Sequence, residues 1–312
     1  MAELQPFFVR FWGVRGSYPT PGAHTVRHGG NTSCLEIQAG GHTLIFDAGS
    51  GVIRLGDALM EQAQEQTQNQ HLALFITHGH GDHLVGFPFF APLFAPTTSI
   101  HLFGPQLAGQ TIEQLVTPLM SPPYFPVDIR RLPSRRFFHT LMSDQCIYWQ
   151  NGGVEPTIMT DVCSPQNRNE ENVCVSARFT SSHPLNGALV YRIDYAQRSI
   201  VYATDVEWCD GCDAGFLAFI QGADVLIHDA QYTTPDYQQV KHGYGHSTVT
   251  MAVEVARQAH VNTLVLFHHE PTYDDEQLDR MEAEARGMFP RSYSAYEGME
   301  IDLLARKIKR GS

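Results

Sequence analysis

One short segment, residues 77–83, constrains this chain more than any other. It reads Thr-His-Gly-His-Gly-Asp-His and directly follows the apolar run of residues 72–76. Three imidazoles and a carboxylate within six consecutive positions are more metal-ligating side chains than an ordinary surface loop carries. A short apolar run is typical of a buried strand. The sequence therefore predicts a metal site at the end of a strand, on a loop where further ligands must converge.

The spacing inside this loop indicates two metal ions. His78 and His80 point to the same side of an extended segment, because side chains alternate with period two. Asp82 and His83 follow a glycine that allows the chain to turn, and so form a second pair. Imidazole nitrogen with carboxylate oxygen suits zinc, manganese or iron, whereas an all-oxygen set suits calcium or magnesium. We expect two divalent ions, with zinc as the first choice and manganese or iron as alternatives.

Length and charge limit the class of protein. The chain has 312 residues, 43% of them hydrophobic, which is enough for a large core. Its net charge of −12 disfavours broad contact with a nucleic-acid backbone, which normally requires a basic surface. We find no apolar stretch long enough for a membrane span and no signal peptide at the start. Six cysteines in a chain of this length are expected to be reduced, so we expect a cytoplasmic protein.

Short strands and helices follow one another in both halves of the chain, without a linker or a clear repeat. We therefore expect one domain over residues 1–312, of the α+β class, with two mixed sheets packed face to face and helices outside. A proline-rich excursion is expected at 121–133, and a solvated tail at 307–310. The expected strands are 7–12, 33–38, 43–47, 99–103, 174–180, 187–194, 199–203, 224–228 and 263–267; the expected helices are 52–64, 106–119, one that begins after residue 248, and 275–286.

Three later residues are candidates for the remaining ligands, because each follows a predicted strand. His183 comes after strand 174–180, Asp205 after strand 199–203, and His268 after strand 263–267. A lone histidine or aspartate past a strand is often only a turn residue. Three in succession are a stronger signal, and a carboxylate at position 205 is suited to bridging two ions. His269 is the competing choice for the last ligand.

In type and order these residues resemble the ligand motifs of the metallo-β-lactamase superfamily. The resemblance spans most of the chain and implies a four-layer αββα sandwich with a binuclear site at one edge of the two sheets. It also implies how the ligands are shared between the ions. His78, His80 and His183 would hold one ion, Asp82, His83 and His268 the other, and Asp205 would bridge them.

Within that superfamily the chain looks like the phosphodiesterase branch, which includes the tRNA 3′-processing endonuclease and cyclic-nucleotide phosphodiesterases. Residues 12–17, 29–33 and 47–51 are similar to its opening motifs, and Asp47 resembles the early aspartate that supports the ligand loop without binding metal. Residues 228–230 resemble the branch's His-Glu-Ala motif, with Asp229 in place of glutamate. His246 resembles its later catalytic histidine.

The expected reaction is attack of a hydroxide bridging two ions on a phosphodiester, with the ions about 3.5 to 4 Å apart. The departing alkoxide needs a proton, and a histidine is the usual donor. We expect His246 in that role, oriented by Asp229, with Asp82 as the third catalytic residue. Arg15 and Ser17 are the candidates for substrate contact, since guanidinium groups suit phosphate oxygens.

The expected substrate is small. The tRNA endonucleases of this branch typically carry a protruding arm between the equivalents of His183 and Asp205, and here two predicted strands fill that short stretch. We therefore expect a compact phosphodiester, first of all a 3′,5′-cyclic nucleotide, with no extended nucleic acid and no membrane as partners. An RNA endonuclease of the tRNA 3′-processing type, a lactone or thioester hydrolase, and a non-catalytic metal- or oxygen-sensing module remain open. The resemblance also implies a homodimer.

Overall fold

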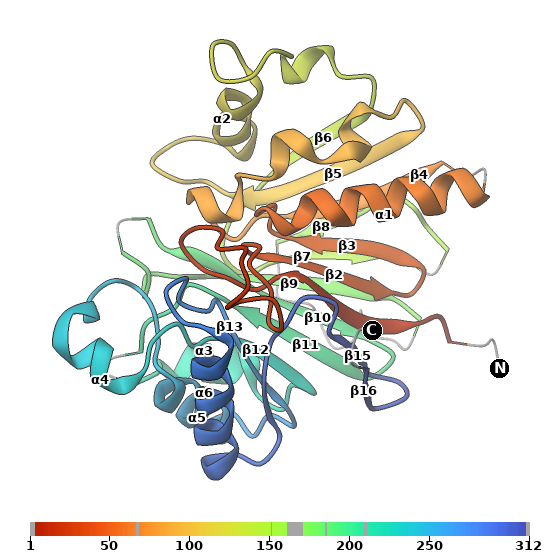
Figure 1. Cartoon of the computed structure of the whole chain (residues 1–312). Coiled ribbons are helices and arrows are strands. Elements are labelled where there is room, and N and C mark those ends of the chain that lie inside the picture. Colours follow the sequence, from red (N-terminus) through yellow and green to blue (C-terminus); the bar gives the residue numbers. More distant parts are fainter. Residues whose placement is uncertain are drawn as a thin grey trace.

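Two eight-stranded mixed sheets pack against each other and are covered on their outer faces by helices, as the computed structural model shows (Figure 1). The structure describes residues 4–66, 69–150, 152–160, 171–184, 186–208 and 211–309. This is the predicted αββα sandwich, and the α+β class is confirmed. Among the described residues, no helix has both the length and the apolar character that crossing a membrane requires.

The first sheet contains the strand that leads into the histidine-rich loop. Its order is β16-β15-β1-β2-β3-β4-β5-β6, and the strands from β3 to β6 run parallel to one another. The strands are β1 Phe7–Gly13, β2 Cys34–Ala39, β3 His42–Phe46, β4 Gln70–Phe75, β5 Thr98–Pro105, β6 Arg135–Leu141, β15 Glu300–Asp302 and β16 Lys307–Lys309.

The second sheet has the order β14-β13-β12-β11-β10-β9-β7-β8, and its β11 to β14 are parallel. Because parallel strands end at the same edge, the residues after β11, β12 and β13 are brought together. The strands are β7 Gln145–Trp149, β8 Thr157–Met159, β9 Val173–Thr180, β10 Ala188–Tyr195, β11 Arg198–Ala203, β12 Val225–Asp229, β13 Leu264–Phe267 and β14 Ser292–Ser294.

Three hydrophobic layers hold the sandwich together. The layer between the sheets includes the stacked rings of Phe46 and Phe75, 4.9 Å apart, and a second layer lies under α1 and α2 on the first sheet. The third lies under α3, α5 and α6 on the second sheet (Figure 1). The helices are α1 Gly51–Gln66, α2 Ile112–Val116, α3 Ala214–Ile220, α4 Thr234–Asp236, α5 Val249–Gln258 and α6 Asp275–Met288.

The structure differs from the expected elements in two places. The predicted helix 106–119 is reduced to the five-residue α2, which begins at the Thr111 capping box and gives way to a 3₁₀ turn at Thr117–Met120. The end of the chain is not a solvated tail as far as residue 309, because β16 pairs with β15 and Lys309 forms an ion pair with Glu300. Arg310 lies outside the described residues.

Candidate metal centre

Four loops at one edge of the sandwich supply the predicted ligands. The histidine-rich loop follows β4, and it ends in a short 3₁₀ turn at Gly81–His83. His183 follows β9, Asp205 follows β11 and His268 follows β13. Asp205 and His268 both adopt positive φ, 53° and 61°, which turns their side chains inward as the strands end. All seven predicted ligands gather at this edge.

One half of the centre consists of three histidines and Asp205. A ligand atom from each of His78, His80, His183 and Asp205 lies within 4.8 Å of all the others. Nε2 of His183 is 3.0 Å from Nδ1 of His80, and Oδ2 of Asp205 is 3.5 Å from His78 Nε2 and 3.7 Å from His183 Nε2. His80 is the exposed member of this group and the others are buried.

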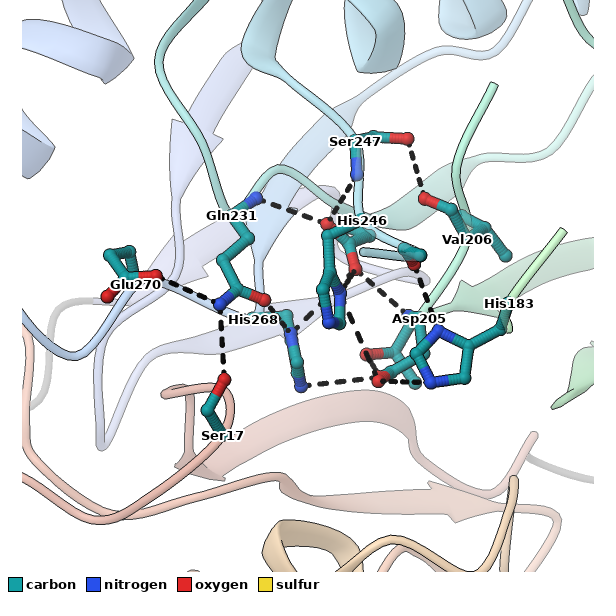
Figure 2. A network of polar contacts seen from close by, with 12 residues as sticks. Ser17, His183, Asp205, Val206, Gln231, His246, Ser247, His268 and Glu270 are labelled. Carbon is teal, nitrogen blue, oxygen red and sulfur yellow. Dashed lines mark hydrogen bonds and ion pairs between the residues drawn. The ribbon is translucent and has the colours of Figure 1, made fainter. Parts of the chain in front are cut away.

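The other half consists of Asp82, His83 and His268, which are all buried. Nε2 of His83 lies 3.3 Å from Nε2 of His268, and Oδ2 of Asp82 lies 3.1 Å from the latter atom. Oδ1 of Asp205 is 3.1 Å from His83 Nε2 and 3.3 Å from His268 Nε2. Asp205 therefore presents one oxygen to each half, which is the geometry of a bridging carboxylate (Figure 2).

Three of the histidines have their outer nitrogen fixed by a protein acceptor. Nδ1 of His83 donates to Asp47 Oδ2 at 2.7 Å, Nδ1 of His183 donates to the Gly245 carbonyl at 3.0 Å, and Nδ1 of His268 donates to Gln231 Oε1 at 3.0 Å. In the neutral form of each ring, a proton held at Nδ1 leaves Nε2 as the nitrogen with the lone pair, and it is this nitrogen that faces the cluster, as a metal ligand must.

The predicted support by Asp47 agrees with its contacts. This carboxylate is fully buried at the end of β3 and accepts from the Thr77 backbone N–H at 2.8 Å and from the Tyr202 hydroxyl at 2.9 Å. It also accepts from Nδ1 of His83, so a single side chain fixes both the start and the end of the histidine-rich loop.

The donor set fits divalent cations. Imidazole nitrogens that face each other at 3.0 and 3.3 Å leave lone pairs opposed unless a proton or a cation lies between them. Nε2 of His78 is buried and has no hydrogen-bond partner, and burial holds the pKa of His78 well below its ordinary value. A buried ring nitrogen without a hydrogen bond is costly, and a metal ion would supply a partner for this Nε2.

His246 and Asp229 form a pair beside this cluster. Nδ1 of His246 donates to Asp229 Oδ2 at 2.7 Å, and the imidazole stacks on His268 with ring centroids 4.8 Å apart. Asp229 is fully buried and also accepts from the backbone N–H groups of Asp205, Gln231 and Ser247. Burial lowers the pKa of His246, but the Asp229 carboxylate outweighs that effect and raises the pKa to about 9.

Of the two residues predicted to contact substrate, Arg15 requires a correction. Its side chain is fully buried, and its guanidinium donates to the backbone carbonyls of Gly29, Glu270 and Tyr273. It anchors these loops and does not face the open side of the cluster. Ser17 is exposed and lies against the cluster, because its backbone N–H donates to Asp82 Oδ2 at 2.8 Å.

The choice between the two neighbouring histidines is decided by where their rings point. His268 turns into the cluster, whereas Nε2 of His269 donates to the Ala295 carbonyl at 3.0 Å on the other side of the chain. Because the backbone of His268 has a positive φ at the end of β13, the rings of His268 and His269 point in different directions.

Two polar residues of the site have no counterpart among the predicted residues. Gln231 accepts from His268 and donates to Glu270 and Ser17 (Figure 2). Glu207 is buried and accepts from the Tyr237 hydroxyl and from the backbone N–H groups of Gly243 and Gly245. Neither residue belongs to a ligand pattern. The sequence could have pointed to them only by position, because Gln231 lies two residues after Asp229 and Glu207 lies two residues after Asp205.

The family comparison covers most of the chain. Residues 42–269 match the model of the β-lactamase superfamily domain. Two curated relatives named Ribonuclease Z are each 27% identical to the chain. The protein from Thermoplasma acidophilum aligns over 326 residues, with 96% of this chain and 97% of the relative covered. The protein from Gemmatimonas aurantiaca aligns over 333 residues, with 96% of each covered.

Solved structures share the fold. YhfI from Bacillus subtilis, described as a metallo-β-lactamase fold protein, superposes with a TM-score of 0.64 at 19% identity and covers 95% of this chain and 99% of its own. A diphosphatase from the PhnP family gives 0.60 at 16%, with 94% and 96% covered. The short form of human tRNase Z gives 0.56 at 21%, with 94% and 98% covered.

Proposed function

Because the chain belongs to the β-lactamase superfamily and has the metallo-β-lactamase fold, we propose that its seven-ligand centre is that of a binuclear phosphodiesterase acting on compact phosphodiesters. The chain is a metal-dependent hydrolase, as its curated relatives named Ribonuclease Z and its clusters of candidate metal ligands indicate. The observation that carries the finer proposal is the buried His246–Asp229 pair, which lies directly beside the ligands.

In this proposal His78, His80 and His183 would hold one ion, Asp82, His83 and His268 would hold the other, and Asp205 would be a ligand of both. Zinc is the first choice, because imidazoles outnumber carboxylates in the set. Bound divalent ions would supply a water that ionises near neutral pH and positive charge opposite the phosphoryl oxygens.

His246 is the proposed proton donor to the leaving oxygen. Its Nδ1 is occupied by Asp229, so Nε2 is the nitrogen that can deliver a proton. With a pKa of about 9 the imidazole is protonated at neutral pH, which suits a general acid. Asp229 keeps the ring in one orientation and stabilises its charged form, because both carboxylate oxygens are themselves fixed by hydrogen bonds.

A compact substrate is supported by the segment between His183 and Asp205. Strands β10 and β11 occupy it and pair from Tyr195 and Arg198 onward, joined by a two-residue turn at Ala196 and Gln197, both with positive φ. Such a turn closes a hairpin tightly. The net charge of −12 also favours a compact substrate, because it disfavours broad contact with a nucleic-acid backbone. A cyclic nucleotide remains the first substrate to assay, although no relative described above supports it in particular.

RNA is the second candidate, and a specific finding favours it. Relatives that match over nearly their whole length are named Ribonuclease Z, and that name conflicts with the expectation that no extended nucleic acid is bound. An endonuclease of the tRNA 3′-processing type would need an RNA-binding surface other than the β10–β11 hairpin.

One set of assays tests the proposal. Protein loaded with zinc or manganese would be given bis(p-nitrophenyl) phosphate, cyclic AMP, precursor tRNA and a lactone. Hydrolysis of bis(p-nitrophenyl) phosphate or cyclic AMP in preference to precursor tRNA supports the compact phosphodiester. Specific cleavage of precursor tRNA at its 3′ side selects the RNA candidate. Hydrolysis of the lactone alone overturns both.

A further inference from the structure

Lys241 lies close to the candidate centre in a chain that is poor in this residue. The sequence contains only three lysines, and the other two, Lys307 and Lys309, are on β16. Lys241 ends the π-helical turn Tyr237–Lys241, which follows α4. A cation at this place is notable because the chain carries a net charge of −12.

The ammonium group of Lys241 is incompletely neutralised. Its Nζ lies 5.3 Å from the ring centroid of Tyr232 and 5.6 Å from that of Tyr244, and its carboxylate partner Glu270 is 4.0 Å away. The same Glu270 oxygen already accepts from Gln231 at 3.1 Å. A pair at the outer limit of ion-pair distance, with side-chain exposure of 31% on the lysine, is weak. The positive charge therefore remains available to a ligand.

This cation adjoins the proposed proton donor. The Tyr232 ring lies close both to the Lys241 ammonium and to the His246 ring, and the centroids of the two rings are 5.9 Å apart. Polar contacts also link Lys241 to the cluster. Its partner Glu270 accepts from Gln231, and Gln231 accepts from His268 (Figure 2). The Lys241 side of the centre is thus the side of His246, from which the leaving group departs.

The segment that carries Lys241 is held in place by Glu207. This buried carboxylate accepts from the Tyr237 hydroxyl, from Gly243 N–H at 2.7 Å and from Gly245 N–H at 2.8 Å. Gly245 has φ of 90°, and a Cβ there would lie 2.4 Å from His183 Nδ1, so the chain passes directly over a ligand. A fixed backbone makes Lys241 a preorganised contact and not a loose surface charge.

We propose that Lys241 and Tyr244 form a subsite for the leaving group of a nucleotide phosphodiester, in which the ammonium binds a second phosphate and the exposed tyrosine ring stacks on the base. Charge-assisted contact with phosphate and stacking on a ring are the two interactions that these side chains offer. The inference rests on the proposed function and narrows its substrate class. A 3′,5′-cyclic nucleotide lacks the second phosphate, whereas a phosphorylated dinucleotide or RNA has one.

Kinetics on matched substrates test this subsite. The substrates are uridylyl-uridine with and without a phosphate on the leaving nucleoside, together with bis(p-nitrophenyl) phosphate. For Lys241→Met we expect kcat/KM on the phosphorylated dinucleotide to fall about tenfold, mostly through KM, and to change less than about twofold on the other two. Lys241→Arg should recover most of the loss, and Lys307→Met should change nothing. Equal effects on all three substrates, or no effect, would overturn the subsite.

Amine labelling gives a readout that is independent of turnover. Zinc-loaded protein would be acylated with and without uridine monophosphate, and the three lysines compared by mass spectrometry. Protection of Lys241, with Lys307 and Lys309 unchanged, supports the subsite; equal labelling of Lys241 in both samples contradicts it. If the wild type cleaved no phosphodiester, the proposed function would fail, while protection of Lys241 would still identify a nucleotide phosphate site.

Discussion

Within the part of the chain that the structure describes, a histidine cluster at the sandwich edge can be compared with one on β5 and β6, and of these two the first has the form of a metal centre. The first gathers five histidines with two aspartates at the sandwich edge. The second lies on β5 and β6, where Nδ1 of His101 and Nε2 of His139 are 3.0 Å apart with nearly parallel rings. Phe137 stacks on His101 and Phe103 stacks on His139. Within the described residues, no group of three candidate ligand atoms includes either histidine of this second cluster.

The difference lies in the carboxylates and in the outer nitrogens. At the sandwich edge the carboxylate of Asp205 has 2% exposure and touches both halves of the cluster, whereas Glu155, 3.3 Å from His101, has 70% exposure. The first cluster also fixes Nδ1 of its histidines through protein acceptors. In the second, a nitrogen of each ring lies at hydrogen-bond distance from the other, and the rings stack with neighbouring phenylalanines. Histidine density alone does not make a metal site.

The largest effect should come from removing the shared carboxylate. We expect Asp205→Asn to lose metal and to lower kcat on bis(p-nitrophenyl) phosphate by about a thousandfold or more, because one side chain serves both halves of the cluster. Elemental analysis and steady-state kinetics would measure the two losses. His139→Phe in the second cluster is the control and should keep both metal and activity. An Asp205→Asn protein with a full metal complement would refute the bridging role.

Replacing His246 should separate acid catalysis from metal binding. For His246→Gln we expect kcat to fall about 10² to 10⁴-fold with metal content unchanged. Since the imidazole must be protonated to act and has a pKa of about 9, wild-type activity should decline as pH rises through about 9, and this decline should disappear in the variant. A pH profile with elemental analysis would decide. Lower metal content would instead make His246 a ligand, with Asp205 and His268 as its neighbours.

Gln231 tests the role of the outer nitrogens. Replacing it with leucine removes the acceptor for Nδ1 of His268, so metal affinity should fall about 10 to 100-fold. Competition with a chromophoric chelator would measure the affinity. Gln258→Leu on α5 is a matched control, because that side chain is exposed and bonds only Glu254 among its described partners. An unchanged affinity in Gln231→Leu would show that His268 is oriented without this contact.

The smallest effect is expected at the second cluster, and it concerns stability. Burial, together with His101, lowers the pKa of His139 to about 4. A histidine whose folded pKa lies below its unfolded value stabilises the fold fully above pH 6.5 and loses that contribution as pH falls towards 4. Between pH 7 and pH 5 the free energy of unfolding in urea should therefore fall less in His139→Phe than in the wild type. The expected difference is about 1 kcal/mol, a value reduced because solvent screens this half-buried ring. An identical pH dependence in both proteins would contradict this.

Much of this picture follows from local sequence. The histidine-rich loop after an apolar strand, and single candidate ligands after β9, β11 and β13, could be located because strand ends and side chains able to bind metal are both visible in a sequence. The αββα sandwich was predicted from the resemblance and is confirmed. The pairing of strands such as β6 and β16 was missed, because these edge strands depend on neighbours that a local sequence pattern does not reveal.

What the sequence determined by itself is which side chains are candidate ligands and at which edge they meet, since these depend on residue type and on where strands end. The tertiary structure decided the rest. It buried Arg15 among backbone carbonyls, turned His268 inward and His269 away, and placed Gln231 and Glu207 behind the cluster. These outcomes depend on hydrogen bonds between loops that are far apart along the chain, and such bonds leave no local pattern by which a sequence alone could reveal them.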